Sequence, residues 1–240
     1  MIEFKNVTKM YFGKKVLDNI SFSINDGDFL CIVGSSGSGK TTLMKMINGL
    51  VSPDVGTVYI DKKEIKNENL TILRRKIGYA LQGNCLFPHM TVEENIGYVL
   101  NLEKNKQCDI EEKVNEMLDL VKLDRKIKYL HPKSLSGGQQ QRVGIARAYA
   151  NSPKILLMDE PFGAVDSITR YKLQNELKEI HKKTKCTIVF ITHDIAEAFK
   201  LSTHILVINL GKIEQIGTKD EVRDFPKTQF VKDLIEMAKY

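Results

Sequence analysis

A run of glycine, serine and lysine near the N-terminus has the composition and spacing of a phosphate-binding loop. Residues 34–41 read GSSGSGKT and fit the pattern G-x-x-x-x-G-K-[ST]. The glycines allow backbone N–H groups to curl around phosphate oxygens, Lys40 is expected to contact the β- and γ-phosphates, and the Thr41 hydroxyl is expected to hold Mg²⁺. An apolar segment, Phe29 to Val33, comes before the loop and a helical segment follows it, as the motif requires. The residues predicted to contact the phosphates are Gly34, Ser35, Ser36, Gly37, Ser38, Gly39, Lys40, Thr41 and Thr42.

Two adjacent carboxylates follow another apolar segment, Ile155 to Met158. Ligands of open α/β sheets bind outside the carboxyl ends of the strands, which is where Asp159 and Glu160 are expected to lie. We expect Asp159 to reach Mg²⁺, directly or through water, and Glu160 to take a proton from an attacking water molecule. An apolar segment that ends in acids is weak evidence by itself, and the phosphate loop earlier in the chain strengthens it.

Residues 135–139 read LSGGQ and open a predicted helix. This pentapeptide matches the signature that defines ABC ATPases, and the chain resembles that family over residues 2–220. The hydroxyl of Ser136 and the amides of Gly137, Gly138 and Gln139 are expected to form a second anion site at a helix N-terminus. The resemblance implies that two copies pack head to tail, so that each ATP lies between the phosphate loop of one copy and the signature of the other.

Two further matches concern the base of the nucleotide and the magnesium ion. Tyr11 matches the family's aromatic residue that stacks on adenine, and Phe12 is the alternative. Gln82 matches the glutamine that senses Mg²⁺ and the transmembrane partner. The resemblance therefore adds Tyr11 and Gln82 to the expected ATP and Mg²⁺ contacts.

Two more matches lie in the second half of the chain. Asp166 ends the segment FGAVD, which resembles the D-loop of the family with Val165 in place of the more usual leucine. His193 matches the switch histidine, which the resemblance implies bonds the γ-phosphate and orients Glu160. The expected catalytic residues are therefore Glu160 and His193.

The loop after Gln82 and two longer stretches of sequence indicate the partners and the cargo of the expected ATPase. Residues 86–90 read LFPHM, and in the family this region receives a short cytoplasmic helix of the permease; local packing of the helical lobe is the alternative. Residues 36–50 and 77–95 look like importer ATPases for quaternary amines such as glycine betaine, carnitine and choline, with polar amino-acid importers as close neighbours. The implied partners are a second ATPase subunit, transmembrane permease subunits and an extracytoplasmic solute-binding protein, at the cytoplasmic face of the membrane.

Many of these importer ATPases carry a pair of regulatory CBS modules after the ATPase domain. Because the sequence stops at Tyr240, we do not expect osmotic gating through such modules.

Helix and strand signals alternate along the chain, which indicates parallel β-α-β units. The segments expected to form strands are Ile2 to Val7, Phe29 to Val33, Ile155 to Met158, Thr187 to Thr192, Ile205 to Ile208 and Ile213 to Ile216. The segments expected to form helices are Thr41 to Leu50, Asp109 to Val121, Gly137 to Ala150 and Ile168 to His181, with another helix opened by the capping box of Thr91 and Glu94.

We therefore predict an α/β fold, and the resemblance implies the P-loop NTPase fold of the ABC ATPase type. It has a mainly parallel sheet core, an N-terminal antiparallel β subdomain and an inserted helical subdomain. The whole chain, 1–240, is expected to be one ABC ATPase domain. Residues 1–83 and 151–220 are expected to form the core and the β subdomain, residues 84–150 the helical subdomain, and residues 221–240 a C-terminal helical tail.

Composition excludes several other classes of protein. No apolar run approaches the roughly 20 residues that span a bilayer, and the first residues lack a signal-peptide pattern. The four cysteines form no C-x-x-C pair, which argues against a zinc site or a disulfide framework, and Cys31 and Cys186 are expected in the core. The net charge of +6 comes from dispersed basic residues, so we expect no nucleic-acid partner.

An ABC ATPase that acts on DNA is the alternative class. Such proteins separate the phosphate loop from the signature by long coiled coils or extra domains. Here only residues 42–134 intervene, without sustained heptads, which favours the transporter class.

Overall fold

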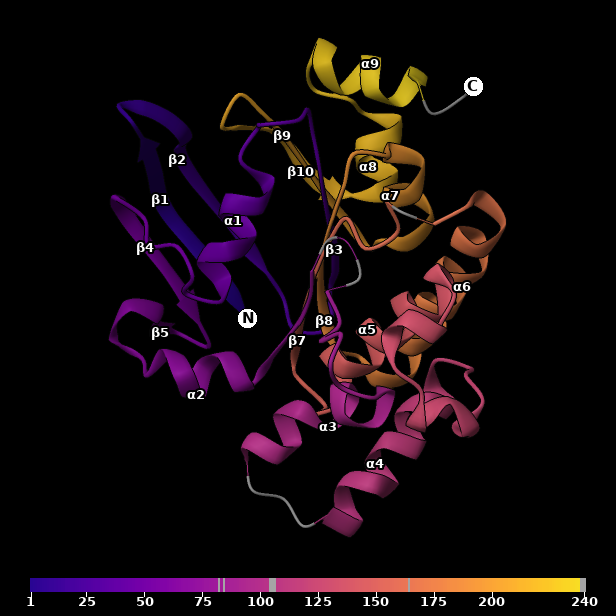
Figure 1. Ribbon diagram of the computed structural model, residues 1–240. Coiled ribbons are helices and arrows are strands. Elements are labelled where there is room, and N and C mark those ends of the chain that lie inside the picture. Colours follow the sequence, from indigo (N-terminus) through magenta and orange to yellow (C-terminus); the bar gives the residue numbers. More distant parts are fainter. Residues whose placement is uncertain (82, 84, 104–106, 164, 238–240) are drawn as a thin grey trace. The chain divides into compact units, whose positions relative to one another are not determined.

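The computed structural model describes residues 1–81, 83, 85–103, 107–163 and 165–237. The chain divides into two compact units, and each is treated by itself (Figure 1). The first unit contains residues 1–74 and 185–240, and the second contains residues 75–184.

An antiparallel sheet forms the N-terminal part of the first unit. Its strands are β1 (Ile2–Tyr11), β2 (Lys14–Ile24), β4 (Val55–Ile60) and β5 (Lys63–Glu64), in the order β2-β1-β4-β5. Buried side chains of β1 and β2 meet on one face of this sheet, where the rings of Phe4 and Phe22 stack with centroids 4.7 Å apart. The alternation of buried and exposed residues is what a sheet with one face toward the core requires.

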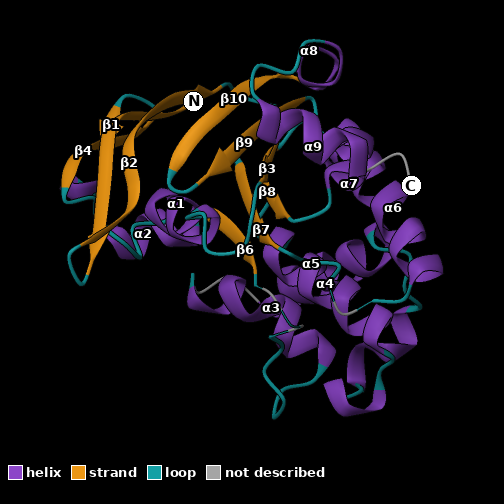
Figure 2. Ribbon diagram, turned by 90° about the horizontal axis from the view of Figure 1, so that it is seen from above, coloured by secondary structure: helices purple, strands orange, loops and turns teal. Residues whose placement is uncertain are grey.

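A second sheet in the same unit carries β10 (Lys212–Thr218), β9 (His204–Asn209), β3 (Phe29–Val33) and β8 (Thr187–Thr192) in that order (Figure 2). Strand β3 is parallel to β8 and β9, whereas β10 is antiparallel to β9. Every residue of β3 and β8 is buried, as expected for parallel strands that are covered on both faces.

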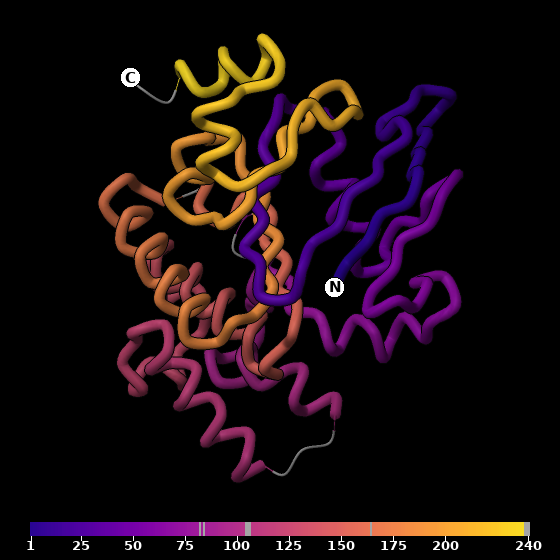
Figure 3. Tube along the Cα trace, turned by 180° about the vertical axis from the view of Figure 1, so that it is seen from behind, coloured from indigo at the N-terminus to yellow at the C-terminus, as the bar shows by residue number. Residues whose placement is uncertain are grey.

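The helices of this unit are short. They are α1 (Lys40–Ile47), α7 (Ile195–Leu201), α8 (Lys219–Asp224) and α9 (Gln229–Met237), with η1 (Ile65–Asn67) before α2 (Leu70–Arg75). The chain returns after β10 through α8 to α9, which the tube view shows as the yellow segment (Figure 3). Helix α9 packs on α7 and β10 through its buried residues Val231 and Ile235.

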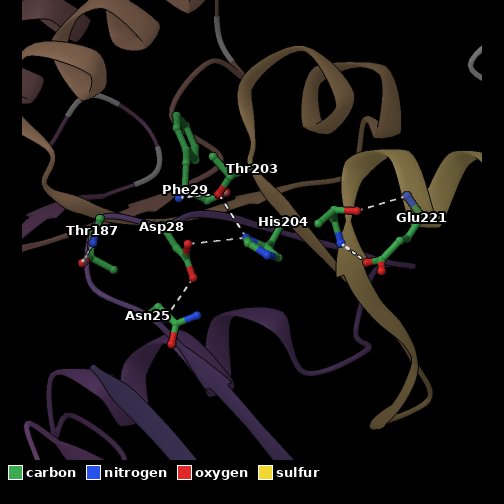
Figure 4. Close-up of polar contacts among 9 residues, drawn as sticks. Asn25, Asp28, Phe29, Thr187, Thr203, His204 and Glu221 are labelled. Atoms are coloured by element: carbon green, nitrogen blue, oxygen red, sulfur yellow. Dashed lines mark hydrogen bonds and ion pairs between the residues drawn. The ribbon is translucent and has the colours of Figure 1, made fainter.

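Polar contacts fix the edge at which β3, β8 and β9 begin (Figure 4). The backbone N–H of Gly27 donates to Thr187 Oγ1 at 2.9 Å, and that of Phe29 donates to Thr203 Oγ1 at 3.0 Å. At the same edge His204 Nδ1 lies 3.5 Å from Asp28 Oδ1. These bonds satisfy backbone groups where the ladder starts.

The second unit combines a parallel strand pair with a layer of helices. Its strands are β6 (Ile77–Ala80) and β7 (Ile155–Asp159), and its helices are α3 (Val92–Leu102), α4 (Gln107–Leu120), α5 (Gly137–Tyr149) and α6 (Ser167–Thr184), with η2 (Arg125–Tyr129) and η3 (Pro132–Ser134) between α4 and α5. Helices α3, α4 and α5 pack on one another through buried residues such as Ile96, Val114 and Val143. Within the described ranges, no helix has the length and apolarity that crossing a membrane demands.

The predicted fold class is confirmed, and most predicted elements agree with the structure to within a few residues. Strands β3 and β8 have the predicted bounds, and the capping box of Thr91 and Glu94 is present. The predicted helix Thr41 to Leu50 ends earlier, at Ile47, because Gly49 adopts a φ of 65° and stops it. Cys31 and Cys186 are buried, as predicted.

Candidate functional site

The phosphate loop joins β3 to α1, and its glycines are required by the backbone. Gly37 and Gly39 have φ values of 75° and 100°, a region that other residues rarely adopt. A Cβ on Gly34 would lie 1.9 Å from the carbonyl oxygen of Ile208. A Cβ on Gly39 would lie 2.7 Å from the carbonyl oxygen of Val16, in strand β2. The loop therefore packs closely between β9 and the hairpin formed by β1 and β2.

The polar groups of the loop suit an anion. The Lys40 ammonium donates to the carbonyl oxygens of Gly34 and Ser35, each at 2.8 Å, which holds this largely buried side chain against the start of the loop. The Ser38 hydroxyl is buried and has no hydrogen-bond partner among the described residues. The N-cap of α1 is Gly39, which offers no side-chain acceptor, so the first N–H groups of α1 lack a side-chain cap. An orphaned hydroxyl and an uncapped helix N-terminus beside a lysine fit a bound phosphate.

The remaining predicted phosphate contacts, Ser36, Thr41 and Thr42, lie in the same loop or in the first turn of α1. The sequence reasoning missed a neighbour of this loop. Asn209, the last residue of β9, accepts a hydrogen bond from the Ser35 hydroxyl at 3.2 Å. No local motif marks Asn209, because only the pairing of β9 with β3 brings it to the loop.

The predicted adenine-stacking residue lies at the end of the first hairpin. Tyr11 is the last residue of β1 and pairs with Lys14 across the turn. The Lys9 ammonium lies 5.4 Å from the centroid of its ring. Phe12, the alternative, is fully exposed in the turn itself with a φ of 49°. Both aromatic rings thus belong to the β1–β2 hairpin, and β2 of this hairpin lies against Gly39 of the phosphate loop.

The predicted switch histidine follows β8 directly. His193 is exposed, while its neighbours hold the turn in place. The Thr192 hydroxyl accepts from the N–H of Asp194 at 3.1 Å, and the Asp194 carboxylate caps α7 by accepting from Ala196 and Glu197. This local network presents His193 at the carboxyl end of a parallel strand.

The predicted acids lie at the carboxyl end of β7, in the second unit. Asp159 is buried, and Glu160 follows it with a φ of 43°. A glutamate in this left-handed region costs energy, and such residues cluster at functional sites. Tyr79 of β6, which sequence reasoning missed, has its pKa raised to about 12 by burial and by the charge of Asp159. The Tyr79 hydroxyl, also without a hydrogen-bond partner among the described residues, is therefore a protonated group near Asp159.

The signature segment begins α5 with a capping box. The N–H of Ser136 donates to Gln139 Oε1 at 2.9 Å, and the N–H of Gln139 donates to Ser136 Oγ at 3.3 Å. A Cβ on Gly137 would meet no atom within 4 Å, whereas one on Gly138 would lie 2.7 Å from Cγ2 of Thr169. The segment thus leaves its N-terminal face open at Ser136 and Gly137, which are both exposed.

The D-loop aspartate caps the first turn of α6. Asp166 Oδ1 accepts from the N–H of Thr169 at 3.0 Å, and the bonds from Thr169 hold the pKa of the Asp166 carboxyl below its ordinary value. The residue is exposed.

Gln82 lies outside the described residues, but the loop that follows it is partly described. Asn95 of α3 is fully buried and accepts from the N–H of Phe87, while its amide donates to the carbonyl oxygens of Phe87, Met90 and Thr91. The Phe87 ring packs 4.8 Å from the ring of Tyr98. Local packing therefore accounts for Phe87, while Pro88 and His89 in the same loop are exposed.

The first unit thus holds the phosphate loop, Tyr11 and His193, and the second holds the acids, the signature and Asp166. The described residues contain no cluster of three or more histidine, cysteine or acidic side chains that could hold a metal ion. A strand–loop–helix anion site with obligatory glycines, within an α/β fold, defines the class of P-loop nucleotide-binding proteins.

Comparison with known proteins narrows this class. The family model described as ABC transporter matches residues 17–163, and the chain belongs to that family. The choline transport ATP-binding protein OpuBA of Bacillus subtilis is 46% identical over 98% of this chain and 62% of its own length. The glycine betaine uptake system ATP-binding protein YehX of Escherichia coli is 42% identical over 98% of this chain and 76% of its own length.

A solved structure agrees with the fold. The dimeric post-hydrolysis state of the ATP-binding cassette MJ0796, bound to ADP and phosphate, is 36% identical, with a TM-score of 0.82 over 91% of this chain and 99% of its own. The chain spans about three fifths of the length of the first curated relatives that it matches.

Proposed function

We propose that this chain is the ATP-binding and ATP-hydrolysing subunit of an importer for quaternary amines, working with a separate membrane permease. The observation that carries the proposal is the phosphate loop, where Lys40 and the orphaned hydroxyl of Ser38 adjoin the uncapped N-terminus of α1. The cargo is proposed from the choline and glycine betaine transport proteins, to which the chain is similar over 98% of its length.

Each group of residues has a proposed task. The phosphate loop holds the triphosphate of ATP, and Tyr11 stacks on the adenine. Thr41, Asp159 and Gln82 would hold Mg²⁺, which neutralises phosphate charge when bound. Glu160 takes the proton of the attacking water, a role worth roughly 10²–10⁴-fold in rate, and His193 contacts the γ-phosphate.

A second copy of the chain completes the site in this proposal. Ser136, Gly137, Gly138 and Gln139 of one copy close on the γ-phosphate held by the other, with Asp166 nearby. The structure of the cassette MJ0796, which is a dimer bound to ADP and phosphate, supports the pairing of two copies. ATP then drives closure because it binds the closed dimer more tightly than the open one, and hydrolysis reverses closure.

The other proposed partners are permease subunits and an extracytoplasmic solute-binding protein. The exposed Pro88 and His89 are proposed to contact a permease helix at the cytoplasmic face of the membrane. No role in nucleic-acid binding is proposed.

Two substitutions separate binding of ATP from its hydrolysis. Lys40→Ala is expected to weaken ATP binding, because it removes the charge that faces the phosphates. Glu160→Gln is expected to bind ATP normally and to lose at least about 100-fold in turnover. Glu103→Gln, a change at an exposed glutamate that caps the end of α3, is the control and should retain activity. Normal turnover by Glu160→Gln would show that another group is the base.

The cargo is tested with the ATPase assembled with its permease and solute-binding protein in proteoliposomes. Choline or glycine betaine is expected to stimulate ATP hydrolysis, whereas arginine and glutamine are expected to have no effect. Stimulation by the amino acids alone would reassign the chain to a polar amino-acid importer.

A further inference from the structure

Thr169, in the first turn of α6, belongs to none of the motifs above, yet it lies against two of them. Its backbone N–H donates to Asp166 Oδ1 at 3.0 Å. Its methyl carbon Cγ2 lies 2.7 Å from the position that a Cβ on Gly138 would occupy. One residue thus contacts both the D-loop and the signature segment.

The geometry of threonine makes this contact stiff. A β-branched side chain has few allowed χ1 rotamers in a helix. The N–H bond to Asp166 holds the backbone of Thr169 in place, so the methyl group can move away from Gly138 only by a change of χ1 rotamer. The space beside Gly138 is therefore fixed by the same residue that contacts Asp166.

A second contact joins the two helices further along. Arg142 follows Gly138 by one turn of α5, and Glu176 follows Thr169 by two turns of α6. Arg142 Nη2 lies 3.1 Å from Glu176 Oε1, and the two side chains are only 19% and 13% exposed. Removing one partner of such a desolvated pair is costly, so the pair adds to the packing of α5 against α6.

We propose that Thr169 is a positioning residue, which locks the signature segment (residues 136–139) to Asp166 so that the two move together, and that Gly138 must be glycine because of Thr169. This inference rests on the proposed function, in which the signature segment closes on ATP held by a second copy. It assigns the need for glycine at 138 to packing within the chain. At position 137 a Cβ would meet no protein atom within 4 Å, so the need for glycine there is assigned to contact with the nucleotide.

The test is a double substitution in the Glu160→Gln background, with the ATP concentration that half-saturates dimer formation as the readout. Gly138→Ala is expected to raise that concentration about tenfold or more, because the added methyl overpacks against Thr169. Adding Thr169→Ser removes the opposing methyl and keeps the hydroxyl, so dimer formation should return to within about threefold of the parent. Thr169→Ser alone loses the methyl group beside Gly138, so it should raise that concentration by no more than about threefold.

Two controls make the test specific. Gly137→Ala should not be rescued by Thr169→Ser, because no protein atom opposes a methyl group at 137. Thr169→Val keeps both the methyl group and the N–H bond to Asp166, so it should not rescue Gly138→Ala, and none of these variants should change the binding of a fluorescent ATP analogue to the monomer. The urea midpoint of each variant is measured in parallel. A purely structural role for Thr169 would shift that midpoint and the affinity for the analogue along with dimer formation.

The outcomes separate this inference from the proposed function. If the Glu160→Gln parent forms ATP-dependent dimers and Gly138→Ala stays equally defective with and without Thr169→Ser, then Thr169 is not the reason for the glycine and the inference is wrong. A parent that remains monomeric in ATP would overturn the proposed function, and the positioning role of Thr169 with it.

Discussion

At the residue scale, the chemistry depends on backbone positions that few residue types can occupy. Gly34 cannot carry a side chain because a backbone carbonyl lies where its Cβ would be. Glu160, in contrast, adopts a left-handed conformation that glycine would favour. Gly34 is therefore the residue type that its position requires. Glu160 adopts a strained conformation, which is retained because its carboxylate is needed for the proposed chemistry.

Gly34→Ala is expected to destabilise the fold by about 3 kcal/mol or more, because backbone atoms cannot move aside as a side chain can. Gly37→Ala is the matched comparison: it has open space and meets only the penalty for its φ of 75°, roughly 1 kcal/mol. Urea unfolding of both variants measures the difference. Equal losses would show that β9 does not press on the loop.

Glu160→Gly is expected to be more stable than Glu160→Ala by about 1 kcal/mol, since only glycine adopts this conformation without strain. Both variants lose the proposed base and should be equally inactive. Thermal unfolding gives the comparison. A less stable glycine variant would mean that residue 160 is not strained in the folded protein.

At the scale of elements, three helices begin with the same device. Capping boxes start α3 (Thr91 and Glu94), α5 (Ser136 and Gln139) and α8 (Thr218 and Glu221). The T-x-x-E pattern at residues 91–94 predicts the first of these. The second fits the related S-x-x-Q pattern, in which the sequence marks Gln139 only as a nucleotide contact, and the structure shows that Gln139 caps the helix.

The capping boxes of α3 and α8 should make stability depend on pH. Hydrogen bonds from Thr91 and Thr218 lower the pKa values of Glu94 and Glu221 below their ordinary 4.5. A carboxyl group whose folded pKa is lowered contributes stability that is complete above its ordinary pKa and is lost as the pH falls through the folded value. We therefore expect the urea midpoint to fall as the pH drops below about 4.5.

Glu94→Gln and Glu221→Gln each keep a side-chain oxygen that accepts the bond from the N-cap N–H, but the amide does not titrate. Gln139 already has this role in α5. The double variant should lose part of the dependence on pH, although other carboxylates continue to titrate. An unchanged slope between about pH 3 and pH 5 would contradict the role assigned to these two side chains.

At the scale of the whole molecule, the sequence predicts the α/β class, because buried strands and amphipathic helices alternate in it and the motifs mark strand ends. It predicts less where contacts join distant segments. Nothing in the residues around Asn209, Tyr79 or Thr169 shows that they adjoin Ser35, Asp159 and Gly138, because those contacts arise from strand pairing and helix packing. Strands β2, β4, β5 and β6 were also not among the predicted strands.

In the proposed mechanism, ATP is enclosed between two copies of this chain. Sedimentation of the Glu160→Gln variant measures this enclosure directly, since one chain has a mass of 27.3 kDa. With ATP, we predict a dimer that contains two nucleotides and is lost when Ser136→Arg is added, while the monomer keeps its affinity for ATP. A species that stays at the mass of one chain with ATP fully bound, and that is indifferent to the change at Ser136, would contradict the account.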